Sequence, residues 1–198
     1  MRGRGAGHRH DHSAALTIRL SWVEEAYPLG YTLLFCEGLT PEEVLQRLGA
    51  RRESLYPLTR VEAQEIEVRN SMDEPFELDH PDVETLEELG FLRRSVDAVV
   101  RAGAIEGWAF AIQASTSYVT TRNFLPTLCA DTRVLVVSRD INAVRGVAYA
   151  VEGRVLPDLD LGDPARVLEH LERRFGLWVP EESEGWRLPA AGLSTGGR

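Results

Sequence analysis

Residues 132–155 read TRVLVVSRDINAVRGVAYAVEGRV, and this stretch decides the fold class. Its apolar runs at 133–138 and 145–151 are rich in β-branched residues, which favours strands. A polar link joins these two runs, and an EG turn leads into a third run at 154–159. The pattern predicts a three-strand antiparallel meander. Its last strand should lie at an edge of the sheet, because Pro157 has no N–H to donate.

Further strands are expected upstream of this meander. Two runs at 96–105 and 108–113 flank a Glu106-Gly107 turn, which predicts a β-hairpin. The run YTLLFC at 31–36 has apolar side chains on both faces and predicts a buried strand. Consecutive hairpins with helices at intervals indicate an α+β fold, with a mainly antiparallel sheet and short helices packed on it.

The clearest helix signal is GLTPEEVLQRLG at 38–49. Thr40 is placed to cap the helix, Pro41 suits its first position, and Glu43 completes a capping box. Gly49 ends the pattern. Weaker signals predict a short helix within 80–90, a helical turn near 124–128, and a helix that begins near Asp163 and ends at Gly176.

The segment 53–89 is strongly acidic, with twelve Asp and Glu residues against two arginines. We interpret it as an acidic insertion. Within it, the alternating stretch 61–68 predicts an edge strand and 70–81 predicts a loop. Acidic runs are most often solvated faces, but this one could also bind a basic partner, with Glu84, Glu87 and Glu88 as contact residues.

Composition excludes several functions. All 22 basic residues are arginine, so no lysine is present for Schiff-base, P-loop or protein-kinase chemistry. The net charge of −9 argues against nucleic acid or an anionic membrane as the main partner. Two cysteines make no disulfide framework, and no signal peptide or membrane span is apparent, so we expect a cytoplasmic protein.

Domain boundaries follow from the same composition. We expect a disordered lead at 1–19, a single α+β domain at 20–178, and a mobile tail at 179–198. We find no internal repeat.

The chain resembles an uncharacterised family of small actinobacterial proteins, a domain of unknown function. The resemblance is carried by GLTPEEVLQRLG, by EGWAFAI at 106–112 and by VSRDINAVRGVAYAVEG at 137–153. It spans 31–49 and 105–176. It implies a cytoplasmic α+β domain and supplies no activity, cofactor or ligand.

Several clusters could carry chemistry, and most have simpler explanations. The HRHDH stretch at 8–12 lacks the spacing of a metallohydrolase site, and DLDLGD at 158–163 lacks the pattern of a calcium loop. A thiol pair of Cys36 or Cys129 with His80 or His170 has no local signature. We therefore expect no metal, no cofactor and no catalytic residue.

The 138–142 link is the best candidate site, because it gathers a hydroxyl, a guanidinium, a carboxylate and an amide between two strands. The tentative ligand or partner residues are Ser138, Arg139, Asp140, Asn142 and His170. Turn chemistry could equally explain Asp140 and Asn142. Two hypotheses remain open: a non-enzymatic interaction or regulatory domain of the immunity-protein kind, and a domain that binds or hydrolyses a small anionic ligand near this link.

Overall fold

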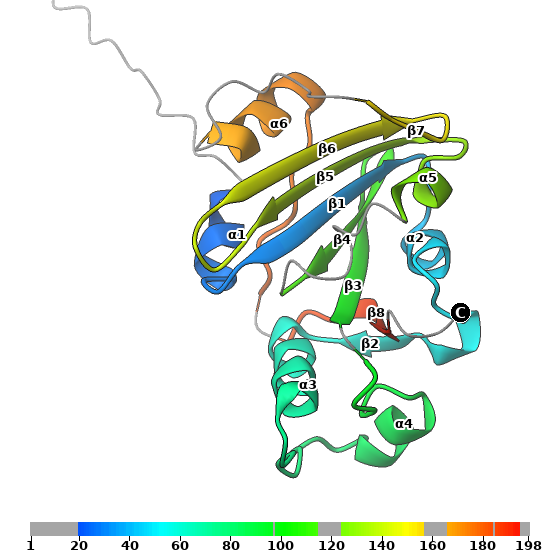
Figure 1. Ribbon diagram of the computed structural model, residues 1–198, viewed down its shortest axis with the longest axis vertical. Helices are drawn as coiled ribbons and strands as arrows, with labels where there is room; N and C mark the ends of the chain where they lie inside the picture. Colours follow the sequence, from blue (N-terminus) through cyan, green and yellow to red (C-terminus); the bar gives the residue numbers. More distant parts are fainter. Residues whose placement is uncertain (1–19, 97, 115–123, 157–165, 184, 195–198) are drawn as a thin grey trace, which may run out of the picture.

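The computed structural model describes residues 20–96, 98–114, 124–156, 166–183 and 185–194. These residues form one eight-stranded antiparallel sheet with short helices on both faces (Figure 1). This arrangement confirms the predicted α+β class. The strand order is β2-β8-β3-β4-β1-β5-β6-β7, so the chain does not add its strands to the sheet in sequence order.

The strands are β1 (Tyr31–Glu37), β2 (Tyr56–Leu58), β3 (Ala98–Ile105), β4 (Trp108–Gln113), β5 (Arg133–Arg139), β6 (Arg145–Val151), β7 (Arg154–Leu156) and β8 (Leu188–Leu193). The helices are α1 (Ser21–Ala26), α2 (Pro41–Arg47), α3 (Arg60–Ser71), α4 (Val83–Glu88), α5 (Leu125–Leu128) and α6 (Val167–Phe175), with a 3₁₀ turn η1 at Arg52–Ser54.

The central strands are buried on both faces, whereas β6 and β7 are mostly half-buried or exposed. On one face, α2 and α5 cover an apolar layer that includes Leu34 and Val136. On the other face, α1 and α6 cover a second layer around Phe35 and Leu135, while α3 and α4 cover a third around Val99. This double burial explains why the central strand β1 is apolar on both sides, as its sequence predicts.

The predicted helix at 41–48 is present as α2. Thr40 accepts a hydrogen bond from the backbone N–H of Glu43, and the Glu43 carboxylate accepts one from the backbone N–H of Thr40. Both partners of the capping box are therefore in place. Val44 and Leu45 are buried against the sheet, which supplies the tertiary packing that so short a helix needs.

The prediction of an edge strand at 61–68 is wrong, because these residues belong to helix α3. Thr59 and Glu62 form a second capping box, which starts the helix at Arg60. The apolar residues of α3 lie on two opposite sides of the helix, and this arrangement resembles strand alternation in the sequence. The local capping signal TRVE at 59–62 is the feature of the sequence that predicts this helix start.

The predicted tail at 179–198 also needs correction. Residues Leu188–Leu193 form β8, which pairs with β3 on one side and with β2 on the other. A strand bonded on both sides is an interior part of the sheet. Pro189 and Gly192 weaken the strand signal of this segment, so its sequence does not predict the strand.

Candidate functional site

The acidic segment forms one end of the molecule. Helices α3 and α4 lie beyond β2 and β8, at the end of the sheet opposite β6 and β7 (Figure 1). The segment 53–89 carries twelve acids against two arginines, a charge of −10. The remaining residues have 20 arginines and 19 acids, a charge of +1. The net charge of the protein is therefore concentrated at this end.

Most of these carboxylates face water. Apart from Asp82, which accepts a hydrogen bond from Tyr56, eight acidic residues of α3, α4 and the connection between them are exposed, and none of the eight forms an ion pair within the described part of the chain: Glu65, Asp73, Glu74, Glu77, Asp79, Glu84, Glu87 and Glu88. We call this set the acidic surface. It includes all three acidic partner residues expected from the sequence.

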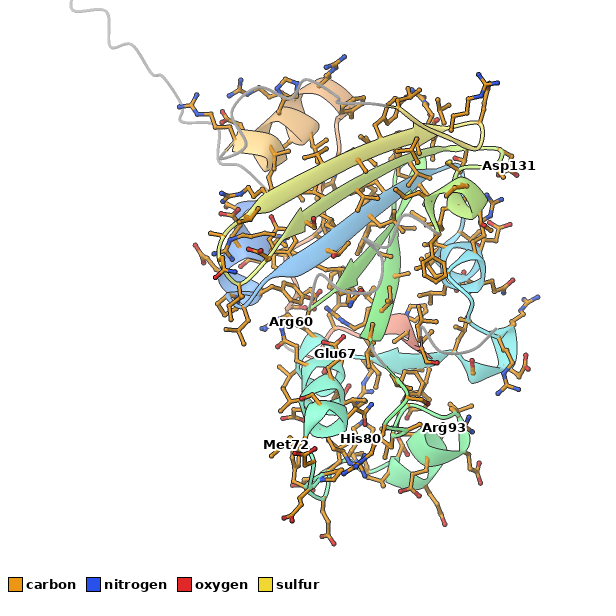
Figure 2. All side chains as sticks on the ribbon, in the orientation of Figure 1. Arg60, Glu67, Met72, His80, Arg93 and Asp131 are labelled. Atoms are coloured by element: carbon orange, nitrogen blue, oxygen red, sulfur yellow. The ribbon has the colours of Figure 1, made fainter. Side chains whose placement is uncertain are left out.

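A polar cluster behind this surface holds α4 against α3. His80 lies between the two helices (Figure 2) and its Nε2 is 3.2 Å from Oε1 of Glu62. The backbone N–H of Asp82, at the start of α4, donates to Nδ1 of His80. Arg187 donates to the same oxygen of Glu62 at 2.6 Å. Both ring nitrogens of His80 are thus used, which makes this histidine a structural connector.

The carboxylate of Glu62 is ionised in this cluster. Burial alone would raise its pKa, but the hydrogen bonds from Thr59 and the charges of Arg187 and His80 hold that pKa below its usual value. One side chain therefore caps α3, binds Arg187 next to β8 and positions His80. The helices that carry the acidic surface are consequently held in place by this cluster.

A second polar cluster is buried between the apolar layers under α1 and α3. Arg101 is only 1% exposed, and it donates two hydrogen bonds to Glu182, at 2.9 and 2.6 Å. It also donates to the hydroxyl of Tyr27 at 2.5 Å. Nearby, Glu67 of α3 accepts from the backbone N–H of Val99 at 2.8 Å. The cluster connects three distant parts of the chain to β3.

Glu67 has the most perturbed carboxyl group in this region. Burial raises its pKa to about 7, although the Val99 hydrogen bond and the charge of Arg101 act in the opposite direction. A raised pKa can mark a catalytic acid. Here the Glu67 carboxylate accepts a hydrogen bond from the sheet, and Arg101 is committed to Glu182, so we interpret the cluster as structural.

The 138–142 link is a tight turn between β5 and β6. Oδ1 of Asp140 accepts hydrogen bonds from the backbone N–H groups of Asn142 and Val144, at 2.9 and 2.8 Å. Ser138 and Arg139 are consecutive in β5, so their side chains point to opposite faces of the sheet. Asp140 therefore serves the turn, and the polar groups of the link do not converge on one point.

Arg139 lies beside other groups that the sequence did not associate with it. It pairs across the sheet with Tyr31 and with Arg145, and it donates to the carbonyl oxygen of Pro28 at 3.3 Å. Arg145 donates to Glu24 of α1 at 2.6 Å. Sequence inspection missed Arg145 and Glu24, because only strand register and helix packing bring them to this end of the sheet.

The remaining candidates lie apart from one another. His170 is in α6, and its buried Nε2 has no hydrogen-bond partner among the described residues. Cys36 and Cys129 are both buried free thiols, and burial raises the pKa of Cys36 to about 12. Such a thiol is a poor nucleophile. Both ring nitrogens of His80 are used in the contacts with Glu62 and Asp82.

The described residues contain no group of three or more His, Cys, Asp or Glu side chains that could hold a metal ion. The stretches 8–12 and 158–163 lie outside these residues. Among the helices that the structure describes, none is long and apolar enough to cross a membrane.

Residues 17–170 match the model of a family of unknown function, DUF6461. Searches of curated proteins and of solved structures found no match. The family match covers most of the chain, including α3, α4 and the strands from β1 to β7. It confirms the resemblance to a domain of unknown function, and the chain belongs to this family.

Proposed function

We propose that this protein is a non-enzymatic regulatory domain that binds a basic partner protein through its acidic surface. The observation that supports the proposal best is the distribution of charge: the segment 53–89 carries −10, and the rest of the chain is close to neutral. A single-sign surface of this kind attracts an oppositely charged partner and raises the rate of association.

The structure of the surface adds support. Glu84, Glu87 and Glu88 are exposed on α4, and the His80 and Glu62 cluster holds that helix in place. Because the backbone that carries these carboxylates is already ordered, binding costs little backbone conformational entropy. The buried free thiols Cys36 and Cys129 suit a reducing compartment, and a cytoplasmic location is part of this proposal.

The alternative, a site for a small anionic ligand near the 138–142 link, has weaker support. It would rely on Arg139 and the neighbouring Arg145, but Ser138 faces the other side of the sheet and Asp140 is used by the turn. Thermal-shift screening of anionic metabolites tests it. Stabilisation that disappears in Arg139→Ala would favour this alternative over the acidic surface.

The experiment for the main proposal measures binding of a fluorescent arginine-rich peptide by anisotropy. The triple variant Glu84→Gln/Glu87→Gln/Glu88→Gln should bind about tenfold more weakly at low salt, and the difference should shrink as salt is added. The control Glu25→Gln/Glu106→Gln/Glu181→Gln removes the same charge from exposed positions elsewhere. Equal losses in both variants would contradict a localised binding surface.

A further inference from the structure

Helix α3 and Met72, the C-cap residue that follows it, expose a row of apolar side chains beside the acidic surface. Val61, Val68 and Met72 are 51%, 54% and 45% exposed. At 100° per residue they lie within about 40° of one another around the helix axis, over a length of about 16 Å. Figure 2 shows Met72 at the C-terminal end of α3, on the side away from the sheet. We call Val61, Val68 and Met72 the α3 stripe.

The α3 stripe has no packing role in the fold described above. The opposite side of α3 is buried: Ala63 and Ile66 pack in the apolar layer around Val99, and Asn70 donates a hydrogen bond to the carbonyl oxygen of Phe91. Valine is also a weaker helix former than the straight-chain residues that usually occupy exposed positions. Neither core packing nor helix propensity therefore explains valines at positions 61 and 68.

Charge around the stripe restricts what can cover it. Glu65 lies between Val61 and Val68 on the same side of α3, and Asp73 and Glu74 follow Met72. These three carboxylates are exposed. A second copy of this chain docked on the same face would bring like charges together, which is destabilising. A partner must instead offer apolar contacts flanked by positive charge.

We infer that the α3 stripe binds an amphipathic basic helix of the partner protein; this inference rests on the proposed function and specifies the partner's binding element. Val61 and Val68 are seven residues apart, which is the repeat of a helix-to-helix seam. A partner helix aligned with α3 places apolar residues on the stripe, and its arginines or lysines reach Glu65, Asp73 and Glu74.

The carboxylates and the apolar side chains contribute differently to binding. The carboxylates accelerate the encounter and select a basic partner, and this contribution weakens with salt. Burial of the valine and methionine side chains gives affinity that persists at high salt. The stripe therefore predicts a component of binding that neutralising the acids of α4 does not remove.

The experiment uses the full chain and two labelled peptides of about fifteen residues. One contains arginine, alanine and leucine, with leucines spaced to form one face of a helix, and the other is a scrambled version of the same composition. The variant Val61→Ala/Val68→Ala tests the stripe, and alanine favours the helix, so α3 stays folded. The control Val144→Ala/Val155→Ala changes two exposed valines far from α3 in the sequence, one in the link before β6 and one in β7.

We expect the amphipathic peptide to bind the protein at least tenfold more tightly than the scrambled one at high salt. That preference should be lost in Val61→Ala/Val68→Ala and kept in the control. Equal binding of both peptides, weakened by the α4 triple variant but not by the valine variant, overturns the inference and leaves the proposed function standing. Failure of both peptides to bind at low salt overturns the proposed function, and the inference with it.

Discussion

Arg101 is the largest fully buried side chain of the described residues, and it is charged. A buried guanidinium requires a partner with good geometry, and the bidentate contact with Glu182 supplies it. The Tyr27 hydroxyl occupies a further donor. This ion pair attaches the segment before β8 to the middle of the sheet, between apolar layers that would otherwise be continuous.

Glu67 gives the sharpest prediction for a single residue. Its pKa in the folded protein is about 7, above the ordinary value of 4.5, so ionisation opposes folding. Stability from the neutral carboxyl is present below about pH 4.5 and is lost as the pH rises through about 7. Glu67→Gln should therefore stabilise the protein at pH 8 by about 1–3 kcal/mol, with little effect at pH 4.5.

Urea unfolding at the two pH values measures this difference. Glu65→Gln is the matched control, because Glu65 lies on the same helix but is exposed. It should change stability little at either pH. A gain for Glu67→Gln that is the same at pH 4.5 and pH 8 would contradict the assignment of a buried, titrating carboxyl group.

Among the elements, α3 shows why a helix can be mistaken for a strand. Its N-terminus is defined by Thr59 and Glu62, which satisfy each other's backbone N–H groups. Its apolar residues, however, occupy both the buried side and the α3 stripe. A one-sided amphipathic pattern is therefore absent, and only the capping box predicts the helix.

The cap of α3 can be tested directly. Thr59→Ala removes the acceptor for the Glu62 N–H and should lower the free energy of unfolding by about 1 kcal/mol. Thr59→Ser keeps the hydroxyl and should lower it much less. Hydrogen exchange should show faster opening of the first turn of α3 in Thr59→Ala alone. If the two variants exchange alike, the capping bond contributes nothing measurable.

In the molecule as a whole, the C-terminal strand completes the sheet. β8 is hydrogen-bonded to β3 and to β2, and it brings Ala190 into the apolar layer under α3. The edge strand β2 pairs only with β8 within the described residues. β2 is therefore joined to the rest of the sheet through β8, whereas α3 also packs directly on β3.

Truncation tests this dependence. A chain ending at Ser183 lacks β8 and exposes the edge of β3, so it should lose cooperative unfolding or melt at a much lower temperature. A chain ending at Ser194 keeps β8 and is the control, with an expected melting temperature close to that of the full chain. If the shorter chain keeps its melting temperature and cooperativity, β8 is not an essential part of the sheet.

Features that depend on neighbours along the chain could be predicted from the sequence. The capping box at Thr40, the glycine turns after Glu106 and Glu152, and the apolar strands β1 and β5 are all local, so the α+β class was predictable. The charge of the segment 53–89 was equally visible, and its interpretation as a partner surface stays a prediction.

Tertiary structure alone decided which distant groups meet. Arg101 binds Glu182, which is 81 residues away in the sequence, and Arg145 binds Glu24, which is 121 residues away. Strand pairing and burial depend on contacts between segments far apart in the chain, and these contacts leave no fixed spacing in the sequence that inspection could find.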